Sequence, residues 1–160
     1  MRMIKKFSFV LLLLLSVGLL TGCDSKKEKN VEGTLEEIMS KVYEKVPEDD
    51  RPMALTNIEV NEENIVTFLG TSDIEYESIL ASEPMVSSIA HSVILIRTKE
   101  GADVGAIKTK IKENINPRKW VCVWVEDDDV IIDSKGDLII VIMVEQEEIR
   151  TLIQEGFNNL

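Results

Sequence analysis

The sequence has very few of the residues on which most catalytic and metal sites depend. It contains one histidine, His91, and two cysteines, Cys23 and Cys122, among 160 residues. A structural zinc site prefers Cys and His ligands and therefore lacks donors here. The sequence also contains no glycine-rich phosphate loop, no G-x-S-x-G and no H-E-x-x-H motif. We therefore expect a protein that has no cofactor and is not an enzyme.

The N-terminus carries the pattern of an export signal. A basic start, residues 2–6, precedes a run of 14 mostly apolar residues, 7–20, which is too short for a typical membrane-spanning helix. The run ends in LTGC, residues 20–23, which resembles the lipobox of bacterial lipoproteins. The resemblance implies that residues 1–22 are a signal peptide and that the Cys23 thiol carries a lipid. Acyl chains such as palmitate would anchor the protein stably at the extracytoplasmic face of the cell membrane.

Positive charge is scarce in the part that follows the signal. Removing residues 1–22 takes away three basic residues and no acidic ones. This leaves 15 Lys and Arg against 29 Asp and Glu, a net charge of −14. Such a surface repels nucleic acid, and it repels anionic membrane beyond the lipid anchor, but it suits cationic partners or calcium. Residues 23–33 are polar and read as the lipidated cysteine and a flexible tether, and we assign residues 34–160 to one domain.

The hydrophobic pattern of that domain predicts an α+β fold. Two N-terminal helices precede a ββαββα core, in which about four strands form a small antiparallel sheet. The Lys135-Gly136 pair is expected to make the turn of the clearest hairpin, 128–144. The predicted helices are 34–46, 62–69, 102–115 and 145–157, the other predicted strands are 74–81 and 85–98, and 118–125 is strand-like or irregular.

One strand of this hairpin predicts how the sheet is covered. Residues 138–144 are seven apolar residues without alternation, whereas a sheet with one wet face should alternate. We therefore expect both faces to be buried. The helices 102–115 and 145–157 are expected on one face. The N-terminal helices, or a second copy of the protein, are expected on the other.

Two stretches resemble a known family. They are EPMVSSIAHSVILIRTKEGADVGAIKTKIKEN, residues 83–114, and PRKWVCVWVEDDDVIIDSKGDLIIVIM, residues 117–143. They are similar to small lipoproteins of low-GC Gram-positive bacteria, catalogued as domain-of-unknown-function family 4358. The resemblance covers roughly residues 34–158 and implies a lipid-anchored extracytoplasmic protein. It implies no activity and no catalytic residues, because the family has none assigned.

The strongest acidic run is a weak candidate for a metal site. Asp127, Asp128 and Asp129 follow Glu126, and carboxylate oxygens are the ligands that calcium prefers. The spacing differs from that of an EF-hand loop, which also requires a glycine and a closing glutamate. We therefore favour a solvated loop over a calcium site.

The sequence just before this run supplies the candidate interaction surface. Arg118 and Lys119 adjoin Trp120 and Trp124, the only tryptophans. The two rings share one side in a helix or a strand, where they either stack on a ligand such as a sugar or close the edge of the core. Between them lies Cys122, for which the apolar stretch WVCVWV favours a buried, inert thiol.

These observations favour a binding protein over an enzyme. The leading expectation is a lipid-anchored, non-catalytic module that binds an envelope protein or forms a homodimer. The alternative is an accessory lipoprotein that binds a small ligand or a cation for a membrane system. A deep pocket with convergent polar groups would favour the alternative, and an exposed apolar patch would favour a protein partner.

Overall fold

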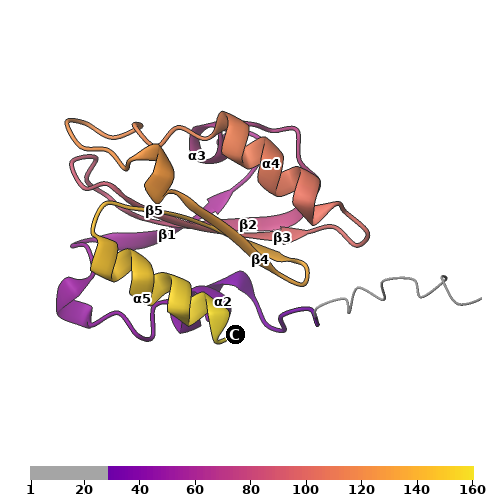
Figure 1. The fold of residues 1–160 in the computed structure, drawn as a ribbon, viewed down its shortest axis with the longest axis horizontal. Coiled ribbons are helices and arrows are strands. Elements are labelled where there is room, and N and C mark those ends of the chain that lie inside the picture. The colour runs from indigo at the N-terminus through magenta and orange to yellow at the C-terminus, as the bar shows by residue number, and fades with distance from the viewer. Residues whose placement is uncertain (1–28) are drawn as a thin grey trace, which may run out of the picture.

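The computed structural model describes residues 29–160, so the signal sequence and the lipidation candidate Cys23 lie outside the described residues. The described chain is of the α+β class, as predicted. Its strands form one antiparallel sheet of five strands in the order β1-β2-β3-β5-β4 (Figure 1). The elements are α2 (Leu35–Val42), η1 (Glu48–Asp50), β1 (Leu55–Val60), α3 (Ile65–Leu69), β2 (Tyr76–Pro84), β3 (His91–Thr98), α4 (Val104–Asn114), η2 (Asp127–Asp129), β4 (Ile131–Lys135), β5 (Leu138–Val144) and α5 (Glu147–Asn158).

Strand β1 is the element that the sequence pattern does not predict. It lies at one edge of the sheet and pairs with β2 from Leu55 opposite Pro84 to Val60 opposite Ile79. Only Val60 of its six residues is fully buried. A strand exposed in this way lacks the apolar repeat by which strands are recognised, and the sheet consequently has five strands where about four were expected.

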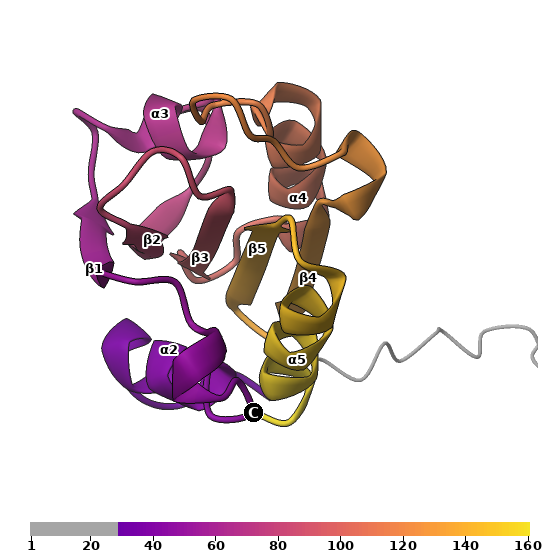
Figure 2. The same ribbon diagram turned by 90° about the vertical axis from the view of Figure 1, so that its left-hand side faces the viewer.

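Helices cover both faces of the sheet (Figures 1 and 2). Side chains of α2 and α5 form one core with Leu138, Ile140, Ile142 and Val144 of β5. Side chains of α3 and α4 form a second core with Ile139, Val141 and Met143. All seven residues of β5 are buried, which confirms that both faces of this strand are covered.

The assignment of helices to faces needs a correction. We expected α4 and α5 on the same face, but α5 packs with α2 and α4 packs with α3. The packing of α5 on α2 is close at Gly156, where an added Cβ would lie 2.2 Å from the carbonyl oxygen of Val42. Glycine thus allows the two helices to approach closely, and the helices of this chain cover both faces without a second copy.

Three smaller predictions also change at the ends of strands. The hairpin turn consists of Gly136-Asp137 rather than Lys135-Gly136, because Lys135 still pairs with Leu138. Gly136 takes the positive φ expected for the turn, 59°. Strand β2 continues through residues 82–84, beyond the predicted end of the strand at residue 81. Strand β3 starts only at His91, so residues 85–90 form a loop.

The N-terminal helix begins as predicted. The hydroxyl of Thr34 accepts a hydrogen bond from the Glu37 backbone N–H at 3.3 Å, and the Glu37 carboxylate accepts one from the Thr34 N–H at 3.0 Å. Together these two hydrogen bonds form a capping box. None of the helices between residues 29 and 160 has the length and apolar character needed to cross a bilayer.

Candidate functional site

The sheet has two chemically different ends. In the pairing of β3 with β5, Arg97 lies opposite Leu138 and His91 lies opposite Val144. These two pairs are separated by about 20 Å, from the usual rise of a strand. We call the end at Arg97, with the turn Gly136-Asp137, the hairpin end. We call the end at His91 the loop end, because the loops 85–90 and 115–126 meet there; both lie at the left of Figure 1.

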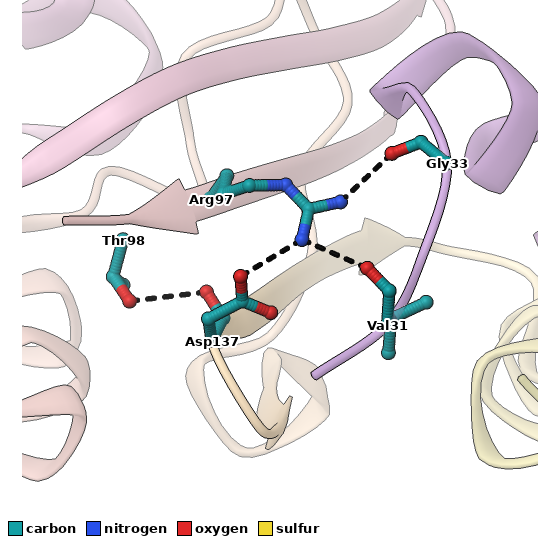
Figure 3. A network of polar contacts seen from close by, with 5 residues as sticks. All are labelled: Val31, Gly33, Arg97, Thr98 and Asp137. Carbon is teal, nitrogen blue, oxygen red and sulfur yellow. Dashed lines mark hydrogen bonds and ion pairs between the residues drawn. The ribbon is translucent and has the colours of Figure 1, made fainter. Parts of the chain in front are cut away.

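At the hairpin end, Arg97 fixes the point where the chain enters the domain (Figure 3). Its guanidinium donates to the Asp137 carboxylate at 2.9 Å, to the Val31 carbonyl at 2.9 Å and to the Gly33 carbonyl at 3.0 Å. The Asp137 carbonyl in turn accepts from the N–H and the hydroxyl of Thr98. One side chain therefore joins the entering segment to two strands.

The remaining contacts at this end bring the two ends of the described chain together. A Cβ on Gly136 would lie 2.9 Å from the Cα of Asn30, so the entering backbone runs directly against the turn. The Lys135 ammonium donates to the carbonyl oxygens of Asn158 and Leu160 at 3.1 and 2.5 Å. The hairpin end thus holds both residues 29–33 and the C-terminus.

At the loop end, the predicted interaction residues separate into two pairs. Lys119 and Trp120 face the protein. The Lys119 ammonium is 2.5 Å from the Glu83 carboxylate, lies 4.9 Å from the Phe68 ring and 5.3 Å from the Trp120 ring, and its side chain is only 14% exposed. Trp120 packs against the core under α3 and α4. This pair holds the loop on the sheet.

Arg118 and Trp124, in contrast, are exposed. The Arg118 guanidinium lies 6.0 Å from the centre of the Trp124 ring, and the indole N–H donates to the Glu126 carboxylate at 2.8 Å. The expectation that the two tryptophan rings share one side is wrong. The segment is an irregular loop in which Cys122 has a φ of 64°, so the spacing of four residues does not align the rings. Cys122 was expected to be buried, but its side chain is exposed. The irregular course of the loop accounts for this difference as well.

Most of the exposed large apolar side chains lie on loops at this end of the sheet. Six large apolar residues are exposed among the described residues, and five of them belong to three loops at this end. A hydrogen bond of 3.1 Å from the Met85 N–H to the Ala54 carbonyl, and one of 2.8 Å from the Val121 N–H to the Ser87 carbonyl, join these loops. We call this group the loop-end surface, and it consists of Met53, Met85, Val86, Val121 and Trp124.

A cleft of about 530 Å³ opens beside this surface, between η1 and the start of α5. Its wall includes His91, which is 2% exposed and whose Nε2 lies 2.7 Å from the Tyr43 hydroxyl oxygen. Burial lowers the pKa of His91 to about 4, so its ring is uncharged at neutral pH. Burial likewise raises the pKa of Tyr43 above its ordinary value. The pair is therefore neutral and serves as a buried hydrogen bond between α2 and the sheet.

The cleft is acidic. Its lining carboxylates are Asp49, Asp50, Glu145 and Glu148, and no ion pair within residues 29–160 involves any of them. Arg51 also lines the cleft, but its guanidinium donates to the carbonyl oxygens of Tyr43 and Val46. Sequence reasoning missed this site because its residues come from three separate segments.

The acidic run Asp127–Asp129 does not form a metal site. The Asp129 carboxylate is 2.8 Å from the Arg150 guanidinium, which is itself nearly buried and also donates to the Val144 carbonyl. Asp127 lies 4.0 Å from Arg118. Within the part of the chain that the structure describes, no three His, Cys, Asp or Glu side chains are grouped to hold a metal ion. Asp129 instead joins the loop before β4 to α5.

Comparisons of the chain with family models, curated proteins and solved structures give no match. The resemblance to domain-of-unknown-function family 4358 therefore stays a prediction. The site therefore consists of an apolar surface on three loops and an acidic cleft next to it.

Replacing Arg97 tests the contacts at the hairpin end. Arg97→Met removes all three of these hydrogen bonds and leaves the Asp137 carboxylate and the carbonyls of Val31 and Gly33 without this partner. We expect the free energy of unfolding to fall by about 1–3 kcal/mol and amide hydrogen exchange in residues 29–34 to become faster. The matched control is Lys110→Met, which removes the exposed Lys110–Asp73 pair of 2.7 Å and should cost less than about 1 kcal/mol. Equal stability of the two variants, with unchanged exchange in residues 29–34, would contradict this assignment.

The buried His91 predicts a specific dependence of stability on pH. The unfolded chain binds a proton near pH 6.5 and the folded chain only near pH 4, so the contribution is complete above pH 6.5 and is lost as the pH falls toward 4. Denaturant titrations should show a loss of about 2 kcal/mol from about pH 7.5 to about pH 5. His91→Gln, which still offers a hydrogen bond to Tyr43 but does not titrate, should lack this loss. Since the chain has a single histidine, an equal loss in both proteins would exclude His91 as the cause.

Proposed function

We propose that this protein is a lipid-anchored, non-catalytic binding module at the extracytoplasmic face of the cell membrane. The export signal and the lipobox-like sequence ending at Cys23 support the anchor. The domain is acidic, and helices cover both faces of its sheet, which supports a role outside the membrane. The observation that carries the binding role is the position of the loop-end surface at the opposite end of the sheet from residues 31–33.

The length of the tether supports an orientation on the membrane. Five residues lie between Cys23 and Lys29, where the described chain begins, and the six fully extended steps that join the two span at most about 20 Å. A lipid on Cys23 would therefore keep the hairpin end close to the membrane. The loop-end surface would then point away from it, toward other envelope components.

The acidic cleft supports a second candidate, a protein that binds a small cation or cationic ligand for a membrane system. Four carboxylates that form no ion pair with another residue of 29–160 line a cleft of about 530 Å³, which is within the usual size range of ligand pockets. We rank it second because the cleft does not account for the exposed apolar side chains beside it.

The two cysteines give a matched test of the anchor. We expect Cys23→Ala to abolish incorporation of labelled palmitate and to release the protein from the membrane fraction of a Gram-positive host. Cys122→Ala removes an exposed thiol that the proposal does not use, so it should leave both labelling and fractionation unchanged. Membrane retention and labelling of the Cys23→Ala protein would overturn the proposal.

A further inference from the structure

We propose that the loop-end surface binds a basic amphipathic segment of a partner protein, one in which apolar anchor side chains are flanked by lysine or arginine. The inference rests on the proposed function and names the class of partner. Three properties of the loop end support the inference. They are its exposed apolar side chains, the contacts that hold its loops in place, and the negative charge around them.

The apolar side chains are too concentrated to be incidental. The exposed fractions of Met53, Met85, Val86, Val121 and Trp124 run from 45% to 83%. Both cores are complete without these side chains. Exposed apolar residues scattered singly need no explanation, whereas a group of them marks an interaction site. Methionine is unbranched and adaptable, and it suits the recognition of partner side chains.

The loops that carry this surface are fixed before any partner binds. Besides the two backbone hydrogen bonds that join them, the Lys119–Glu83 contact ties the loop 115–126 to β2. The Ser92 hydroxyl donates to the same Glu83 oxygen at 2.6 Å, which adds β3 to the junction. A surface held in this way loses little conformational entropy on binding.

Carboxylates outnumber cationic side chains in the hollows beside the surface. A second hollow, of about 260 Å³, contains Trp124 and Cys122 together with Glu145, and Glu145 also lines the acidic cleft. The apolar surface and the unpaired carboxylates are therefore neighbours. Most cations of this region face a carboxylate of their own: Lys119 faces Glu83, Arg150 faces Asp129, and Arg118, beside the Trp124 ring, faces Glu126 and Asp127. Arg51 donates to backbone carbonyls.

The negative charge near the loop-end surface favours one class of binding partner. A second copy would bring the same acidic rim against itself, and like charges across an interface cost affinity. An anionic membrane is repelled for the same reason. A protein segment with lysine or arginine beside its apolar side chains satisfies both the loop-end surface and the carboxylates next to it.

The test uses residues 24–160, which contain every side chain of both cores, and a synthetic amphipathic Leu/Lys helix as the probe. Titration calorimetry should detect binding that weakens as salt is added. Met85→Ser or Val121→Ser should weaken it about tenfold, and Glu145→Gln should reduce its salt dependence. Val66→Ser changes an exposed apolar residue on α3 outside this surface, so it should leave the affinity unchanged.

The control peptides decide between the possible outcomes. A Leu→Ser peptide of equal charge, and a Lys→Glu peptide of equal apolarity, should both fail to bind. Equal binding of the serine peptide, unaffected by Met85→Ser, would overturn the inference in favour of simple cation binding in the cleft. A concentration-dependent dimer by light scattering that Trp124→Ser abolishes would overturn it in favour of a second copy. Either result would leave the lipid anchor standing, because the anchor fails only if the Cys23→Ala protein is still labelled.

Discussion

The structure depends on the burial of β5 from both sides. Each fully buried Leu, Ile or Val contributes about 1.5–3 kcal/mol when it leaves water, and all seven residues of Leu138–Val144 are buried. Successive side chains of a strand point to opposite faces, so no single layer of helices can cover this strand. The chain meets the requirement with α2 and α5 on one face and α3 and α4 on the other.

In this arrangement the two ends of the sheet have different roles. Helices occupy the faces, so the connections between elements emerge at the ends. At the hairpin end a two-residue turn joins β4 to β5, and Arg97 binds the entering chain beside it. At the loop end the connections carry apolar side chains that neither core needs. The proposed anchor and the proposed binding surface follow from this division.

The sequence predicts the elements that are regular and strongly apolar, and it fails where contacts come from distant segments. The capping box at Thr34, the helices α4 and α5 and the double burial of β5 could all be read from local patterns. The hydrogen bonds of Arg97 could not, because they join residues 40 to 66 positions apart. The edge strand β1 was missed because one buried residue in six gives no repeat.

The candidate site was predicted only in part, for a related reason. Of the four residues named as a possible interaction surface, Arg118 and Trp124 are exposed, whereas Lys119 and Trp120 hold the loop on the sheet. Met85 and Val86 were assigned to a strand because they are apolar. Pro84 before them and Ser87-Ser88 after them are the signals that could have marked a loop.

The central claim is that the hairpin end faces the membrane and the loop end faces away. The most direct test is energy transfer to headgroup acceptors in vesicles that carry the lipidated protein. One donor is placed on the native Cys122. The other is placed on Glu100→Cys in a Cys122→Ser background, at an exposed position in the connection after β3. The account predicts much stronger transfer from position 100 than from position 122. Equal transfer from the two positions, or stronger transfer from Cys122, would contradict it.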